Sequence, residues 1–401
     1  MGRIKADLLY MKELNRRLIL DTIRQHGEIS RAEIAKTTKL NPSTVTRIIA
    51  DLIEEGFVRE TGYADSHGGR KPILVDLVPD AAFIIGINVE TNLVIGIVSN
   101  LVGDIIYNIH LPLPSHSKED VLGAIIRAGD WLLDQAAGSD QEIIGIGVAM
   151  HGLVDSVKGI ALFPPAFGWK DLPLGELLEK RFNMPVRLEN NARAMALGEW
   201  WFGAGRNSTN FIALKVGYGI GSGIILNGQI FRGVDFTAGE IGHTTVTIDG
   251  PLCDCGNYGC LEALASVNAL VRNAARALKS GQDSKILELA GAADAVQPQH
   301  IFTAAAQNDP LAIRLLQETG RYLGIALASL TNVLNPTKIL IGGDLAPALD
   351  FILPTLTETV QTRAMEIPAQ RLEIRGVELG EYSPAIGAVT LILEDMFKPI
   401  S

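Results

Sequence analysis

Every cysteine of this chain lies in one short segment. Cys253, Cys255 and Cys260 fall within GPLCDCGNYGC, residues 250–260, although the chain has 401 residues and three cysteines in all. His243 lies just upstream, at the end of AGEIGH. Three thiolates and one imidazole can complete a tetrahedral zinc site, and four protein ligands leave no open position for catalysis. We therefore expect a structural Zn²⁺ at these four residues. The alternative is reduced cysteines beside an ordinary histidine.

A second set of residues has the chemistry to contact DNA. Small or basic side chains follow Pro42 and lie off the apolar stripe of a predicted helix: Ser43, Thr44, Thr46 and Arg47. Such side chains allow close approach to bases and phosphates. The alternative is the solvated face of a plain helical bundle.

The elements around these residues predict a helix-turn-helix. Ser30 and Glu33 form a capping box, which starts one short helix. Asn41 then caps a second helix with Pro42 at its first position. Together with an amphipathic helix in LNRRLILDTIRQHG, this makes three helices with a tight turn, whose last helix enters the major groove.

A loop between two strands extends this motif. FVRETGY and KPILVDL alternate apolar and polar residues, and ADSHGGRKP lies between them. Arg70 and Lys71 supply cations beside two glycines, a composition that suits a narrow minor groove. The sequence therefore predicts a winged module over residues 1–79. The alternative for the loop is a solvated linker with incidental charge.

The rest of the chain, residues 80–401, predicts two α/β lobes. Apolar strands such as AFIIGINVE, EIIGIGVAM and KILIGGD alternate with helical patterns such as KEDVLGAIIRAGDWLLDQAAG. The strand-rich halves are similar to each other, so we expect a cleft between two lobes, where ligands usually bind.

Composition limits the class of protein. The chain is 47% hydrophobic, has no run of roughly 18 apolar residues and shows no secretory h-region. An odd number of cysteines argues against a disulfide framework, so we expect a cytoplasmic protein that does not enter a membrane. The net charge is −10, but residues 1–80 hold 13 Lys and Arg against 12 Asp and Glu. Acid is thus concentrated after residue 80, which permits a basic face on the N-terminal part.

Two motifs in this order resemble the ROK family, which groups bacterial repressors and sugar kinases. GYGIGSGIILNG, GVDFTAGEIGH and CDCGNYGCLE resemble the family signature. SRAEIAKTTKLNPSTVTRIIADLIEEGFV with GGRKP resembles the winged helix-turn-helix of its NagC, Mlc and XylR-like regulators. The resemblance runs from about residue 14 to PAIGAVTLILEDMF. It implies a two-lobed, actin-like sugar-kinase (RNase H-like) fold after residue 80, with a sugar bound in the cleft.

The same resemblance allows a check for kinase chemistry. In the first phosphate loop, Asn88, Glu90 and Asn92 replace the Asp, Gly and Thr of the kinases, and Glu90 would repel a phosphate. Asn191 replaces the catalytic Asp, and an amide is no general base. The second loop keeps its glycines but has Tyr218 where Thr is usual. We therefore expect no catalytic residues and no kinase activity; the alternative is an active ATP-dependent sugar kinase with a DNA-binding head.

Sugar recognition is a separate matter, because it needs hydrogen bonds rather than a base. The resemblance implies a sugar site at these residues: Gly152, Asn190, Asn191, Glu240, His243 and Glu262. The alternative for Glu240 and Glu262 is a structural role in a helix or turn.

The combined interpretation is a sugar-responsive bacterial regulator, a repressor of carbohydrate genes. Its expected partners are operator DNA, a sugar or sugar derivative, and a second copy of the chain in a homodimer or larger homo-oligomer, because paired modules meet paired half-sites. Control by a regulatory protein partner is a third possibility.

Overall fold

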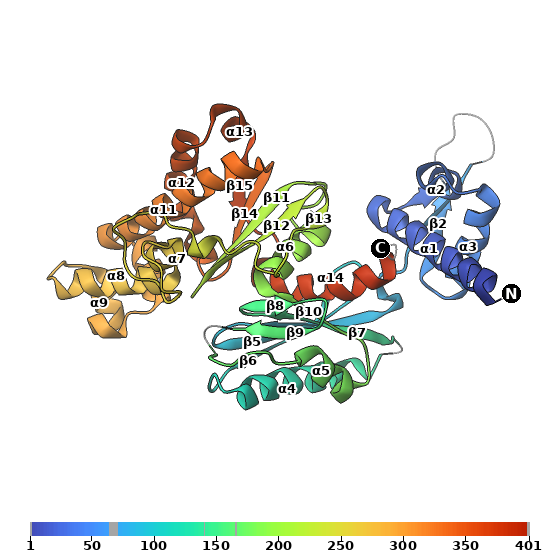
Figure 1. Ribbon diagram of the computed structural model, residues 1–401, viewed down its shortest axis with the longest axis horizontal. Helices are drawn as coiled ribbons and strands as arrows, with labels where there is room; N and C mark the ends of the chain where they lie inside the picture. Colours follow the sequence, from blue (N-terminus) through green and yellow to red (C-terminus); the bar gives the residue numbers. More distant parts are fainter. Residues whose placement is uncertain (1, 64–70, 140, 165–166, 399–401) are drawn as a thin grey trace.

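The computed structural model describes residues 2–63, 71–139, 141–164 and 167–398. Its elements form a small N-terminal module beside two larger α/β lobes (Figure 1). Within these ranges, no helix combines the length and the apolar character needed to cross a membrane.

The N-terminal module has the predicted helices and strands. Its helices are α1 (Gly2–His26), α2 (Arg31–Thr38) and α3 (Pro42–Glu54). A three-stranded sheet joins β1 (Ile29–Ser30), β3 (Ile73–Leu77) and β2 (Val58–Tyr63), in that order and with antiparallel pairing. Helix α1 is longer than the sequence pattern indicated.

Local chemistry sets the boundaries of α2 and α3. The predicted capping box at Ser30 and Glu33 is present, and the Asn41 side chain accepts a hydrogen bond from the Ser43 N–H. Lys39 takes a left-handed conformation (φ 58°) and makes the tight turn between the two helices. The apolar stripe of α3 is fully buried: Val45, Ile48, Ile49 and Leu52. Helix α3 therefore presents its opposite, polar side to solvent.

The first lobe contains a five-stranded sheet in the order β10-β7-β4-β5-β6. Its strands are β4 (Phe83–Val89), β5 (Leu93–Ser99), β6 (Ile105–Pro112), β7 (Ile143–Met150) and β10 (Val186–Asn190). The first three form an antiparallel meander, whereas β7 and β10 are parallel to β4. The lobe also holds α4 (Lys118–Ala136), α5 (Leu174–Phe182) and the hairpin of β8 (Leu153–Asp155) and β9 (Ile160–Phe163).

The second lobe repeats this topology. Its sheet has the order β13-β12-β11-β14-β15, again with three antiparallel strands followed by two parallel ones. The strands are β11 (Phe211–Val216), β12 (Ile220–Leu226), β13 (Gln229–Ile230), β14 (Lys338–Gly342) and β15 (Glu373–Gly376). Strand β11 therefore holds the place that β4 holds in the first lobe, and the expectation of two similar lobes is confirmed.

Two helices, α6 (Asn191–Phe202) and α14 (Ser383–Phe397), pack tightly against each other and connect the lobes. Helix α14 lies on β4 and β7, while α6 lies on β11 and β12. A Cβ at Gly147 would come within 1.9 Å of the Ala388 carbonyl oxygen, and one at Gly387 within 1.7 Å of the Ala194 carbonyl oxygen. These glycines are needed because the backbones approach so closely.

The remaining helices cover the second lobe (Figure 1). They are α7 (Leu261–Ala265), α8 (Val267–Lys279), α9 (Lys285–Ala290), α10 (Pro298–Ala306), α11 (Pro310–Leu334), α12 (Leu349–Arg363) and α13 (Glu366–Arg371). Helices α11 and α12 pack along each other, and their apolar residues form one core with β11, β12 and β14.

The N-terminal module contacts the body of the protein through the ends of α6 and α14. The Arg24 guanidinium of α1 lies 3.9 Å from the centre of the Trp201 ring and 5.8 Å from that of Phe397. Arg17 donates a hydrogen bond to the Lys398 carbonyl oxygen at 3.4 Å. Figure 1 shows α14 running toward α1.

Candidate functional site

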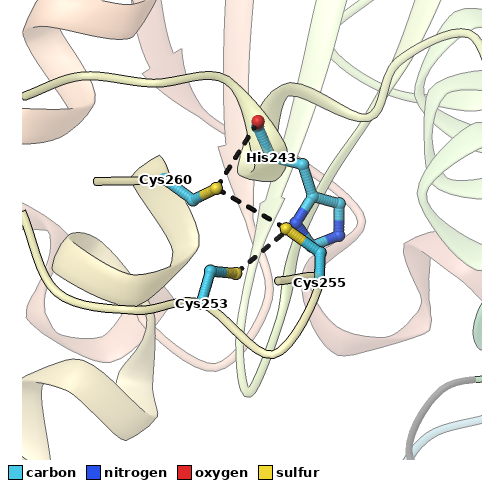
Figure 2. Close-up of side chains that lie close together, drawn as sticks. All are labelled: His243, Cys253, Cys255 and Cys260. Atoms are coloured by element: carbon cyan, nitrogen blue, oxygen red, sulfur yellow. Dashed lines mark hydrogen bonds between the residues drawn. The ribbon is translucent and has the colours of Figure 1, made fainter. Parts of the chain in front are cut away.

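The four predicted metal ligands lie together (Figure 2). One donor atom from each of His243, Cys253, Cys255 and Cys260 falls within 4.8 Å of the others. The Cys253 Sγ is 3.7 Å from the His243 Nδ1, and the Cys255 Sγ is 3.7 Å from the Cys260 Sγ. A tetrahedral zinc with Zn–S bonds of about 2.3 Å separates its sulfurs by about 3.8 Å. The spacing therefore fits one metal ion.

Backbone geometry brings these side chains to one point. His243 ends the short 3₁₀ helix Ile241–His243, and Cys260 is the residue before α7. Gly256 and Gly259 both have positive φ, which permits the tight turns between the cysteines. Burial raises the pKa of Cys253 and of Cys260, so a cation beside them would favour their thiolate forms.

The segment that carries these ligands also carries two of the predicted sugar-binding carboxylates. Glu240 precedes His243, and Glu262 follows Cys260. Glu240 interacts electrostatically with both His243 and Glu262, and burial raises its pKa. The Glu262 carboxylate accepts a hydrogen bond of 2.8 Å from the Ile220 N–H. One oxygen of Glu262 is thus engaged by backbone at the start of β12.

Asn190 and Gly152 meet at the end of β10. The Asn190 Nδ2 donates to the Gly152 carbonyl oxygen at 2.8 Å, and its Oδ1 accepts from the N–H groups of Ala192 and Arg193. Asn190 is therefore the N-cap of α6, with both ends of its amide engaged. Gly152 has φ 88°, and a Cβ there would lie 2.4 Å from the Pro164 Cα.

Asn191 contacts a largely buried ion pair, Glu90 with Lys215, and shares no hydrogen-bond partner with Asn190. Its Nδ2 donates to Glu90 at 3.3 Å, and the Lys215 Nζ lies 2.8 Å from the same carboxylate. Burial favours the neutral form of Glu90, but Lys215, Asn88 and His151 together outweigh it, so the pKa of Glu90 is lowered. Burial likewise opposes the charge on Lys215, and Glu90 raises its pKa. Both groups are therefore charged, and the pair joins the two lobes.

The repeated topology explains why this pair forms. Glu90 follows directly after β4, and Lys215 lies near the end of β11, the equivalent strand of the second lobe. The sequence analysis did not single out Lys215. A lysine inside the apolar run FIALKV is a signal that could have identified it, because buried lysines are rare unless paired.

Two further groups border this pair. Asp344, just after β14, interacts electrostatically with Lys215, and burial raises its pKa. His151 interacts electrostatically with Glu90, Lys215 and His116, and burial lowers its pKa to about 4. His151 is therefore neutral at pH 7.

A second buried charge cluster, also missed by sequence analysis, fixes the loop that precedes Glu240. Glu189, fully buried, accepts hydrogen bonds of 2.7 Å from both Arg193 and Arg232. Arg193 also donates to the Phe236 carbonyl oxygen at 2.9 Å. This network ties the 231–239 loop of the second lobe to β10 of the first. Charged residues inside the apolar pattern RLENNARAMA were the available signal.

The predicted DNA-contacting residues lie on the solvent side of α3, with Ser43, Thr46 and Arg47 exposed and Thr44 half-buried. The Ser43 hydroxyl donates to the Asn41 Oδ1, and the Thr46 hydroxyl to the Pro42 carbonyl oxygen. Lys71 is exposed just before β3, and Arg70 lies outside the described residues. Lys36 and Lys39 are also exposed, on α2 and in the turn before α3.

Comparison with known proteins supports both parts of this arrangement. Residues 84–395 match the ROK family, and residues 13–59 match a winged helix-turn-helix DNA-binding family. A xylose repressor of Caldicellulosiruptor bescii is 33% identical over 97% of both chains. The DNA-binding transcriptional dual regulator NagC of Escherichia coli is 32% identical over 97% of this chain and 95% of its own.

Solved structures agree with these sequence matches. A ROK family transcriptional regulator, a homologue of the E. coli Mlc protein, superposes with a TM-score of 0.85, with 27% identity and coverage of 97% of this chain and 98% of its own. A ROK family glucokinase from Streptomyces griseus, solved with glucose and AMPPNP, has a TM-score of 0.70 and 30% identity over 77% of this chain and 99% of its own. The chain therefore belongs to the ROK family, as one of its winged helix-turn-helix transcriptional regulators.

Proposed function

We propose that this regulator represses carbohydrate genes and that a sugar or sugar derivative, bound between its lobes, alters its hold on operator DNA. The observation that carries this proposal is the union, in one chain, of a winged module with a ROK domain. Relatives that match nearly the whole chain are named xylose repressor or N-acetylglucosamine repressor. The winged module is taken as residues 1–79 and the ROK domain as residues 80–401.

Operator DNA would be bound by the polar side of α3 and by the wing. Exposed hydroxyls and a guanidinium on one helix face supply base and phosphate contacts. The residues proposed for this role are Ser43, Thr44, Thr46, Arg47, Arg70 and Lys71. Because winged modules act in pairs on paired half-sites, we also propose a homodimer, to be tested by light scattering of the purified protein.

The sugar would lie among Gly152, Asn190, Asn191, Glu240, His243 and Glu262. Glu240 offers a half-buried acceptor for hydroxyl protons, and His243 can offer its second ring nitrogen because Nδ1 faces the Cys253 thiol. A Zn²⁺ held by His243 and the three cysteines would have a structural role, keeping the segment from Glu240 to Glu262 rigid. Metal analysis of the purified protein tests this assignment.

Kinase activity is not part of the proposal. The Glu90–Lys215 pair places a carboxylate in the loop that would hold phosphates, and Asn191 cannot accept a proton as a base does. A coupled ATP-turnover assay with D-xylose, D-glucose and N-acetyl-D-glucosamine should show no turnover above background. Sustained turnover would instead support the alternative of an active kinase with a DNA-binding head.

The experiment that tests the whole proposal measures operator binding with and without sugar. Binding to the chain's own promoter region is titrated by fluorescence anisotropy, first alone and then with each of the three sugars. A sugar that changes the dissociation constant at least fivefold supports the proposal. No change with any of the three sugars, despite tight DNA binding, would favour control by the regulatory protein partner.

A further inference from the structure

The Glu90 carboxylate accepts hydrogen bonds from three side chains on separate elements. Lys215 Nζ donates to Oε2 at 2.8 Å, Asn191 Nδ2 to the same oxygen at 3.3 Å, and Asn88 Nδ2 to Oε1 at 2.9 Å. The side chains of Glu90 and Lys215 are only 18% and 11% exposed. Glu90 is thus the centre of a buried polar cluster at the junction of the lobes.

The negative charge of Glu90 determines which end of the Asn88 and Asn191 side-chain amides points toward it. An ionised carboxylate only accepts hydrogen bonds, so a neighbouring amide must present its NH₂ group and not its oxygen. Lys215 and Asn88 hydrogen-bond this carboxylate, and together with His151 they lower the pKa of Glu90 by more than burial raises it, so Glu90 is ionised. The Oδ1 atoms of Asn88 and Asn191 therefore face away from Glu90.

Both of those oxygens remain available as acceptors. The Asn88 Oδ1 is buried without a hydrogen-bond partner, although Asn88 is only 1% exposed. Among the described residues, no donor bonds to the Asn191 Oδ1. A buried acceptor without a partner, as at Asn88, is costly, and such sites are often completed by a ligand or a water molecule.

We infer that Glu90, held by Lys215, is a positioning residue that leaves the Asn191 carbonyl oxygen as the group offered to the effector. The site then requires a hydroxyl donor from the ligand and discriminates against an acceptor at that position. This inference rests on the proposed function, because it assumes that a sugar binds at Asn191. It gives a role to the carboxylate that follows β4 and to the lysine of β11 that pairs with it.

The test removes the charge and keeps the packing. In the double variant Glu90→Gln/Lys215→Met, a glutamine can turn either end toward Asn191, and no unpaired charge stays buried. Calorimetry measures binding of D-xylose, D-glucose and N-acetyl-D-glucosamine, and then of each monodeoxyfluoro analogue of the sugar that binds. Fluorine replaces a hydroxyl donor with a weak acceptor of similar size.

The expected result is a change in discrimination, which a purely structural role would not produce. In the wild type, one fluoro analogue binds at least tenfold more weakly than its parent sugar. In the double variant, that penalty shrinks to threefold or less, while the other analogues keep their ratios. An unchanged penalty at every position overturns the inference. The surface pair Arg181–Asp130 provides the matched control, and Arg181→Met/Asp130→Asn should leave every ratio unchanged.

A second measurement separates this inference from the proposed function. The side-chain NH₂ resonance of Asn191, identified by its loss in Asn191→Asp, reports the bond to Glu90 without any ligand. The resonance should shift in Glu90→Gln/Lys215→Met and stay in place in the control. If none of the three sugars binds but the resonance shifts, the proposal of a sugar effector is wrong, while the orientation of the Asn191 amide by Glu90 is supported. If the resonance does not move, the positioning is wrong whichever sugar binds.

Discussion

Arg24 of the winged module stacks on Trp201, at the opposite end of α6 from Asn191. The guanidinium lies 3.9 Å from the ring centre. Helix α6 runs from Asn191 to Phe202 as one unbroken element between the two lobes. One rigid helix therefore connects a proposed sugar-binding residue with the surface on which the DNA-binding module rests. A movement of the first turn of α6 would therefore displace Trp201 at the other end of the helix, and with it the contact to Arg24.

The first prediction concerns this contact. Arg24→Met removes the cation but keeps the aliphatic stem, and a cation–π contact of this kind contributes about 0.5–2 kcal/mol. We expect the dissociation constant for operator DNA without sugar to change less than threefold. The ratio of the dissociation constants with and without sugar should fall at least fivefold. Anisotropy titrations with and without sugar measure both. Arg181→Met is the control, because Arg181 lies over the Phe182 ring within the first lobe. An undiminished sugar response in Arg24→Met would exclude this route.

The second prediction concerns the metal cluster. Cys253 is buried and Cys255 is exposed, yet both are expected to be ligands. Cys255→Ser should therefore lose the metal as completely as Cys253→Ser, and sugar affinity should fall because Glu240 and Glu262 are no longer held. Atomic absorption gives the zinc content, and calorimetry gives the sugar affinity. If Cys255→Ser retained one zinc per chain with unchanged sugar binding, Cys255 would not be a ligand.

The third prediction concerns the DNA-binding face. Arg47 is exposed on the polar side of α3 and forms no salt bridge within the described residues. Arg47→Ala should weaken operator binding and, if the guanidinium contacts a phosphate, reduce the slope of log K against log salt by about 1. Lys118→Ala, at the start of α4 in the first lobe, should leave both values unchanged. A normal slope with relaxed sequence preference would mean that Arg47 reads a base.

Most of the architecture could be predicted from local patterns. Alternation of apolar strands with helices predicted the lobes, and the residues Ser30, Glu33 and Asn41 predicted the helix starts of the winged module. These features depend on near neighbours in the chain, so they are visible in the sequence. The cysteine cluster was equally accessible, because its ligands lie within residues 243–260.

The contacts between the lobes could not be predicted in this way. Glu90 and Lys215 are 125 positions apart, and only the repeated strand order places them side by side. Glu189 and Arg232 are 43 positions apart and belong to different lobes. The apolar residues around Lys215 and Glu189 indicate that these charges are buried, but nothing in the local pattern identifies the residue that pairs with each. The stacking of Arg24 on Trp201 was likewise beyond local reasoning, because it depends on how the module rests on α6 and α14.

The fourth prediction concerns pH and His151. Burial lowers the pKa of His151 to about 4, whereas an unfolded histidine titrates near 6.5. Between these values the unfolded chain binds the extra proton, so the free energy of unfolding decreases as the pH falls from 6.5 toward 4. The loss attributable to His151 is at most about 1.4 kcal/mol per pH unit. Urea unfolding at pH 7 and pH 5 should show a smaller loss for His151→Gln than for the wild type; equal losses would assign the effect to other groups.

The fifth prediction tests whether restoring the catalytic carboxylate is enough for kinase chemistry. Asn191→Asp would place a second carboxylate beside Glu90, at the position where Asn191 now donates a hydrogen bond of 3.3 Å. Two adjacent carboxylates raise the pKa of one of them, so the variant should lose about 1–3 kcal/mol of unfolding free energy at pH 7. A raised carboxyl pKa costs stability only above its unfolded value, so this loss should shrink toward pH 4.

The same variant should show no ATP turnover with any of the three sugars, because Glu90 still repels phosphate. In Glu90→Gly/Asn191→Asp the repulsion between carboxylates is gone, but Lys215, whose side chain is only 11% exposed in the wild type, loses its hydrogen bond to Glu90. Adding Lys215→Ser to this double variant removes the buried charge. The resulting triple variant should regain most of the unfolding free energy that the double variant loses. Turnover in Asn191→Asp alone would show that the Glu90–Lys215 pair leaves room for a nucleotide, and the absence of a base would then be what makes the wild type inactive.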